Sequence, residues 1–178
     1  NKETRRSISC STIFLGSCLL YSSSRTQKLV SLSSAEAEVY ACSSGASDGL
    51  LLAGIISWMT NSKVKIYLLT DSSGARGILQ RQGVGRVRHL SCRVLWLQEY
   101  INSGQIKLST VAGSCNPADI GTKRLPCARL RSLMCLLGMY NLTTAEVEGA
   151  SDPGGIMTKK ANMLAMLSAL SLFQKGCD

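Results

Sequence analysis

This 178-residue chain has little histidine, few aromatic residues and no C-x-x-C cysteine pair. Its one histidine is His89, and none of its eight cysteines forms a C-x-x-C pair, which excludes the thiolate and imidazole clusters that hold zinc. Aromatic residues make up 5% of the chain, so base stacking on exposed rings is not expected to be its main way of binding nucleic acid. We expect the cysteines to be reduced thiols of an intracellular protein.

Long apolar runs and a leader sequence are also missing. No uninterrupted apolar run reaches the ~18 residues of a membrane span, and no charged-then-apolar leader opens the chain. We therefore expect a protein that is neither inserted in a membrane nor secreted. The chain begins at Asn1 without a Met, and we interpret it as a fragment of a longer protein.

Positive charge is abundant and unevenly placed. Lys and Arg number 20 against 11 Asp and Glu, for a net charge of +9, and most of the excess lies between Asp71 and Arg131. Such a segment predicts a surface that contacts phosphates, although a basic face that only keeps the protein soluble is the simpler alternative. The predicted nucleic-acid-binding residues are Arg76, Arg86, Arg88, His89, Lys123 and Arg124.

The hydrophobic pattern predicts an α/β domain over residues 1–140, followed by a linker and a short apolar tail over 141–178, which we expect to be poorly ordered. Ser33 and Glu36 match the S-x-x-E capping box, and Pro117 favours a helix start. The expected order is a hairpin over 7–15 and 18–23, a helix to about residue 60, a strand over 64–70, a helix to 80, a helix over 89–103, a strand over 106–111, and helices from 117 and over 125–139.

Three acidic residues fall at the edges of these expected elements. Glu38 lies on a helix face of small residues, Asp71 ends a strand, and Asp119 lies in the first turn of a helix. Clustered carboxylates without soft ligands suit Mg²⁺ or Mn²⁺. The structural alternatives are that Glu36 serves the capping box, that Asp71 caps the next helix and that Asp119 favours the helix dipole.

Six short motifs occur in a fixed order along the chain and together indicate a family. Taken together, they resemble the ribonuclease H region at the C-terminal end of copia-type retrotransposon Pol polyproteins, over residues 4–139. The motifs are TRRS at 4–7, LSSAEAEVYA at 32–41, TDSS at 70–73, RH at 88–89, SGQIKL at 103–108 and NPADIGTKRLP at 116–126.

The resemblance implies a ribonuclease H-like mixed sheet flanked by helices. It also implies cleavage of the RNA strand of an RNA–DNA hybrid, with Mg²⁺ (or Mn²⁺) held by four carboxylates. Glu38, Asp71 and Asp119 match three of the four, and His89 matches a structural or substrate-facing histidine. The implied partners are the hybrid and the reverse transcriptase portion of the same polyprotein, in a cytoplasmic particle or the nucleus.

The chain departs from this pattern at its start. The family's first aspartate lies on a strand ahead of Arg5 and Arg6, and that strand sits at the centre of the sheet. We therefore expect a divided sheet, a missing metal ligand and weak or no hydrolysis by this chain alone. The alternatives are a non-catalytic, basic nucleic-acid-binding remnant of a mobile element, and a pseudogene product without a role.

Overall fold

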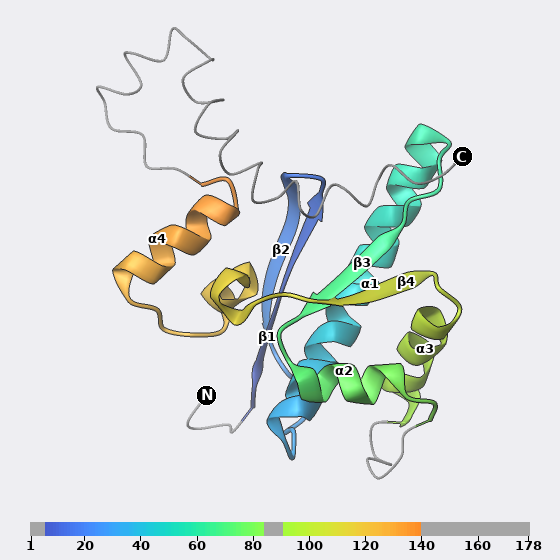
Figure 1. Ribbon diagram of the computed structural model, residues 1–178, viewed down its shortest axis with the longest axis horizontal. Helices are drawn as coiled ribbons and strands as arrows, with labels where there is room; N and C mark the ends of the chain where they lie inside the picture. The colour runs from blue at the N-terminus through green and yellow to red at the C-terminus, as the bar shows by residue number, and fades with distance from the viewer. Residues whose placement is uncertain (1–5, 84–90, 140–178) are drawn as a thin grey trace, which may run out of the picture.

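The computed structural model describes residues 6–83 and 91–139. The fold is α/β, as expected, with two small sheets and helices around them (Figure 1). The tail over 141–178 and the predicted residues Arg86, Arg88 and His89 lie outside the described part of the chain. The elements are β1 (Ile8–Leu15), β2 (Cys18–Thr26), α1 (Ser34–Thr60), β3 (Ile66–Thr70), α2 (Ser73–Gln80), α3 (Ser91–Asn102), β4 (Ile106–Thr110), η2 (Gly113–Cys115), η3 (Pro117–Gly121) and α4 (Cys127–Leu136).

The first sheet is the predicted hairpin. Strands β1 and β2 pair antiparallel across a tight turn, where Gly16 adopts a φ of +60° that glycine tolerates at no steric cost. A bulge between Ile13 and Phe14 shifts the register, and β2 continues to Thr26, three residues beyond its predicted end.

The second sheet pairs β3 with β4 in parallel, with Ile66 opposite Ile106. Among the described residues, no strand of this sheet is hydrogen-bonded to the hairpin, so the strands form two separate two-stranded sheets. A divided sheet is what the resemblance led us to expect. Figure 1 shows α1 running beside both sheets, and its residues contact β1 and β3 alike.

Helix α1 begins where the capping box predicts. The Ser33 hydroxyl accepts the Glu36 N–H at 3.2 Å, and the Glu36 carboxylate accepts the Leu32 N–H at 2.5 Å. Glu36 is buried at this helix start, which confirms its structural role. The first half of α1 packs into the core, which includes Val39, Cys42, Ala46, Ala75, Leu79, Val94, Leu97 and Ile106.

The second half of α1 is more exposed than the sequence suggests. The 27-residue helix is long and apolar enough to cross a membrane by length and composition alone, contrary to our expectation that no segment would be. Core helices of soluble proteins pass the same test. Helix α1 contacts both sheets, α2 and α3, and 22% of its most apolar window is buried.

The elements near the end of the domain are shorter than predicted. Pro117 opens a five-residue 3-10 helix rather than an α-helix, and α4 covers Cys127–Leu136 rather than 125–139. Pro126 is the N-cap of α4 and has an extended backbone, with no side-chain capping hydrogen bond. Asp119 still lies in the first turn of its element, as predicted.

Candidate functional site

Each of the three predicted acidic residues is positioned by a different element. Glu38 lies in the second turn of α1, Asp71 directly follows β3, and Asp119 lies in η3. Asp71 does not cap α2, because the N-cap is Ser72, whose hydroxyl accepts the Ala75 N–H at 3.1 Å. The Asp71 side chain is therefore available for another role.

The charges of Asp71 and Asp119 both act on the pKa of Glu38. Burial raises the pKa of the Glu38 carboxyl above its ordinary value of 4.5, and the negative charges of Asp71 and Asp119 raise it further. The positive charge of Lys123 partly offsets this effect. The Asp119 side chain, 81 residues away in sequence, therefore acts on the charge of Glu38.

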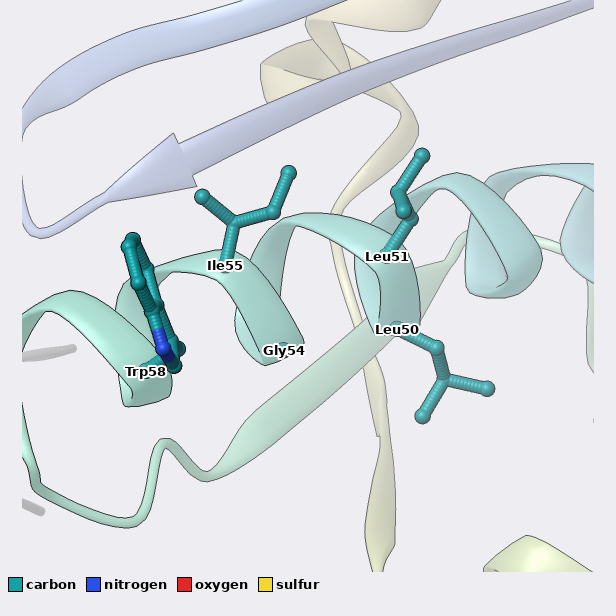
Figure 2. Close-up of a pocket in the computed structure, with 5 residues that line it drawn as sticks. All are labelled: Leu50, Leu51, Gly54, Ile55 and Trp58. Atoms are coloured by element: carbon teal, nitrogen blue, oxygen red, sulfur yellow. The ribbon is translucent and has the colours of Figure 1, made fainter.

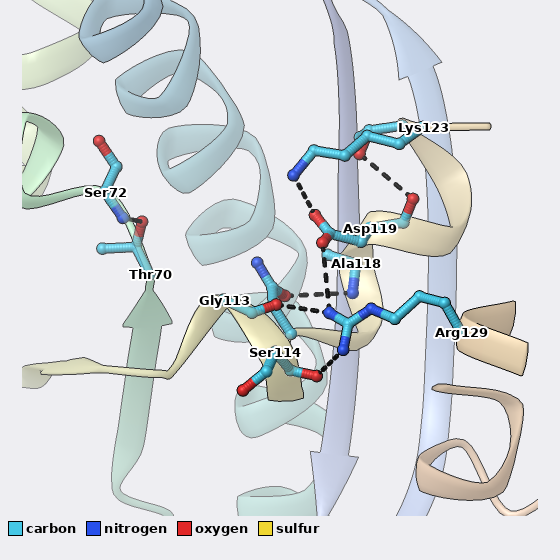
Figure 3. A network of polar contacts seen from close by, with 10 residues as sticks. Thr70, Ser72, Gly113, Ser114, Ala118, Asp119, Lys123 and Arg129 are labelled. Atoms are coloured by element: carbon cyan, nitrogen blue, oxygen red, sulfur yellow. Dashed lines mark hydrogen bonds and ion pairs between the residues drawn. The ribbon is translucent and has the colours of Figure 1, made fainter. Parts of the chain in front are cut away.

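Asp119 is buried and held by two cations, as Figure 3 shows. The Lys123 Nζ lies 2.7 Å from Oδ1, and the Arg129 Nη2 lies 3.7 Å from Oδ2. Arg129 also donates to the carbonyl oxygens of Gly113, at 2.6 Å, and Ser114. The carboxylate of Asp119 thus does more than favour the dipole of a short helix.

Asp71 faces the loop that follows β4. Its Oδ2 lies 3.4 Å from the point where a Cβ on Gly113 would stand, so the chain of η2 passes close to this carboxylate. Arg129 is bonded to the carbonyl of the same glycine. The loop from η2 therefore links the surroundings of Asp71 with those of Asp119.

The donors suit a hard divalent cation by chemistry but not by position. Carboxylate oxygens are the ligands that Mg²⁺ and Mn²⁺ prefer. Within residues 6–83 and 91–139, however, no three His, Cys, Asp or Glu side chains are close enough to hold one metal ion. Asp119 is instead neutralised by Lys123 and Arg129.

Cys42 lies on the same face of α1 as Glu38 but does not add a metal ligand. Burial raises the pKa of its thiol to about 12, against the lowering effect of a hydrogen bond with Thr70. A thiol with this pKa stays protonated at neutral pH, and the thiolate is the form that binds metals. Cys42 therefore serves as a small core residue.

The basic residues near the site have unequal roles. Arg76, at the start of α2, donates to the Thr110 hydroxyl at the end of β4, and Arg124 is exposed beside Lys123. Arg129 was not among the predicted site residues, although its guanidinium reaches Asp119. Only its place in a basic segment marked it, because a ten-residue separation from Asp119 carries no local signal.

An apolar hollow lies elsewhere, on the second half of α1 (Figure 2). It is lined by Leu50, Leu51, Gly54, Ile55 and Trp58 and has a volume of about 410 Å³. None of these residues carries an acid, a base or a nucleophile. The hollow is therefore separate from the chemistry of the carboxylates.

Comparison with known proteins finds similarity to a retrotransposon Pol polyprotein. A retrovirus-related Pol polyprotein from transposon TNT 1-94 of Nicotiana tabacum is 25% identical to this chain over 119 residues. The match covers 66% of the chain and 9% of the polyprotein, so the chain spans a small part of that relative. No family model and no solved structure matches the chain. The similarity supports an origin in a retrotransposon Pol polyprotein.

Proposed function

We propose that this chain is the ribonuclease H-like region of a copia-type retrotransposon Pol polyprotein. In the intact polyprotein it takes part in hydrolysing the RNA strand of RNA–DNA hybrids with Mg²⁺ or Mn²⁺. The observation that carries the proposal is that Asp71, at the end of β3, and Asp119, in η3, both raise the pKa of Glu38 in α1. The relationship to a Pol polyprotein supports the context.

In this proposal, Glu38, Asp71 and Asp119 would supply carboxylates to the divalent ions, although in the described residues they do not lie close enough together to hold one ion. The chemistry that such ions would supply is activation of a water molecule and stabilisation of the leaving oxygen of a phosphodiester. The protein's own part is to place the exposed Glu38 side chain where the negative charges of Asp71 and Asp119 act on it, so that its own negative charge favours a cation. The chain next to Asp71 carries Gly113, which leaves room beside Oδ2.

The divided sheet suggests why the chain alone is a weak enzyme in this proposal. The hairpin and the β3–β4 pair are separate among the described residues, although α1 contacts both. We expect a strand from elsewhere in the polyprotein to join them and to bring the fourth carboxylate. The described residues contribute three of the four carboxylates in this proposal, and we expect this chain alone to hydrolyse hybrids slowly or not at all.

The test is cleavage of an RNA–DNA hybrid by a longer Pol product that includes this chain, with double-stranded DNA as a second substrate. We expect the RNA strand alone to be cut, only when Mg²⁺ or Mn²⁺ is present. Asp71→Asn should lower the rate roughly 100-fold or more. Glu99→Gln, which removes a negative charge from an exposed position on α3 outside the carboxylate group, is the matched control. A longer product that does not cut the hybrid, or an Asp71→Asn variant that cuts it normally, contradicts the proposal.

A second function, non-catalytic binding of nucleic acid, is favoured by the two cations at Asp119. Lys123 and Arg129 occupy the carboxylate that a metal ion would use, and the chain carries a net charge of +9. If binding is the function, the longer product binds the hybrid without cutting it. The same assay, read once for binding and once for cleavage, separates the two functions.

A further inference from the structure

We propose that the apolar hollow on the second half of α1 is the docking site for the chain's own tail, through the uncharged segment of residues 161–173. The inference is independent of the proposed function, because none of the residues that line the hollow belongs to the carboxylate group. The tail lies outside the described residues, and its part is inferred from its sequence and its length.

The hollow is an exposed apolar surface without charge. Its side chains come from successive turns of α1, and Figure 2 shows Leu51 and Ile55 projecting from the same side of the helix. The Leu51 residue is 66% exposed and Trp58 is 84% exposed. No Asp, Glu, Lys or Arg lies between Asp48 and Lys63 in the sequence. This face of α1 therefore suits a partner that binds by apolar contact rather than by ion pairing.

The tail supplies a segment of matching chemistry. Residues 161–173 contain no Asp, Glu, Lys or Arg. Their apolar residues Met163, Met166, Leu167 and Leu170 recur at i, i+3, i+4 and i+7, the spacing typical of one face of a helix. Anchors at this spacing are the means by which an amphipathic helix binds an apolar groove. The spacing therefore predicts that these four side chains contact α1.

The tail is also long enough to reach the hollow. The described residues end at Met139, and 21 residues separate it from Ala161. A flexible linker of this length has an r.m.s. span of about 25 Å, whereas a domain of this size has a radius of gyration of about 14 Å. The segment can therefore reach any face of the domain, at an effective concentration in the millimolar range.

The size of the hollow favours this tethered segment over a second copy of the chain. Five residues line it, and its volume is about 410 Å³. A stable interface between separate proteins buries about 800 Å² and about 20–30 residues on each side. A tethered segment needs less contact, because its association does not depend on the concentration of a partner.

Trp58 reports directly on this contact, because it lines the hollow. The experiment is acrylamide quenching of tryptophan fluorescence in the full 178-residue chain, with Trp58→Phe supplying the contribution of Trp96, the second tryptophan. We expect Trp58 to be protected in the unsubstituted chain, and Leu167→Asp to raise its quenching constant several-fold. Ser168→Asp is the matched control, because it adds the same charge on the opposite side of the predicted helix, and it should leave the quenching unchanged.

Equal quenching of Trp58 in the unsubstituted chain and in Leu167→Asp overturns the proposal, and so does an equal rise in Ser168→Asp. Protection that is lost on dilution, with a dimer in light scattering, assigns the hollow to a second copy and also overturns it. Circular dichroism checks folding, and Leu167→Ser, which adds no charge, carries the test if Leu167→Asp is not folded. Protection of Trp58 in a monomer, lost in the Leu167 variant alone, supports the proposal whether or not the longer product cleaves the hybrid.

Discussion

Glu36 and Glu38 are two residues apart on one helix and have opposite roles. The Glu36 carboxylate accepts the Leu32 N–H and closes the start of α1. Glu38 lies on another side of the helix, because residues i and i+2 do not share a face. There the negative charges of Asp71 and Asp119 raise its pKa. The Glu36 carboxylate therefore stabilises the start of α1, whereas the surroundings of Glu38 disfavour its ionised form.

This unfavourable ionisation gives a prediction for the stability of the Glu38→Gln variant. The folded-state pKa of Glu38 is raised above 4.5, so the native state binds this proton more tightly than the unfolded state does. The resulting stabilisation is complete below pH 4.5 and is lost as the pH rises through the folded-state pKa. Gln cannot ionise, so the variant should have a higher Tm than the unsubstituted chain at neutral pH and a similar Tm at about pH 3.5.

Thermal unfolding followed by circular dichroism at both pH values checks this prediction. Glu99→Gln, at an exposed position on α3, is the control and should show no such pH-dependent gain. A Glu38→Gln variant that is less stable than the unsubstituted chain at neutral pH would mean that the ionised carboxylate is stabilised by its surroundings.

At the scale of the elements, η3 and the hairpin are held together by a close backbone approach. A Cβ on Gly121 would lie 2.5 Å from the Cys10 Sγ and 3.1 Å from the Ser24 Cβ. The Ser24 hydroxyl also donates to the Gly121 carbonyl at 2.7 Å. Because Asp119 and Lys123 flank this glycine, the contact also fixes the position of the candidate site.

Gly121→Ala should therefore destabilise the chain by about 1–3 kcal/mol, because the added methyl group overfills a packed contact. Gly49→Ala is the matched control. Gly49 lies inside α1, and a Cβ there would meet nothing within 4 Å, so alanine should stabilise the helix by about 0.5–1 kcal/mol. Urea unfolding measures both. Equal effects of the two substitutions would show that the Gly121 contact does not constrain the fold.

The elements were largely predictable from local patterns, whereas their contacts were not. The capping box located α1 and the alternation located the hairpin, because these signals depend on neighbouring residues. The 3-10 form of Pro117–Gly121 was missed, because its short length is set by the packing of Gly121 on the hairpin. The role of Arg129 was missed for a similar reason, since only tertiary packing brings it to Asp119.

At the scale of the whole molecule, the basic excess predicts how nucleic acid binds. The net charge is +9, and exposed cations such as Arg124 lie beside the carboxylate group. Four phosphate contacts would make the affinity for an RNA–DNA hybrid fall roughly 100-fold between 50 and 200 mM salt. Fluorescence anisotropy with a labelled hybrid measures this fall. Binding that does not change with salt would contradict a phosphate-contacting surface.

The candidate site depends on elements from both sheets. Helix α1 carries Glu38 and contacts both sheets, the second sheet ends at Asp71, and η3 joins the hairpin to Asp119. The convergence of the carboxylates therefore depends on the whole described chain. The sequence identified the three acids, but it could not indicate that Lys123 and Arg129 would neutralise one of them.

The shared site is tested most directly by measuring the pKa of Glu38 by NMR, from the side-chain carboxyl carbon as the pH is varied. We expect a pKa above 4.5 in the unsubstituted chain. We expect a lower value in Asp71→Asn and in Asp119→Asn, but not a full return, because burial remains. A Glu38 pKa at its ordinary value, or one that neither substitution changes, would show that the three carboxylates do not form one site.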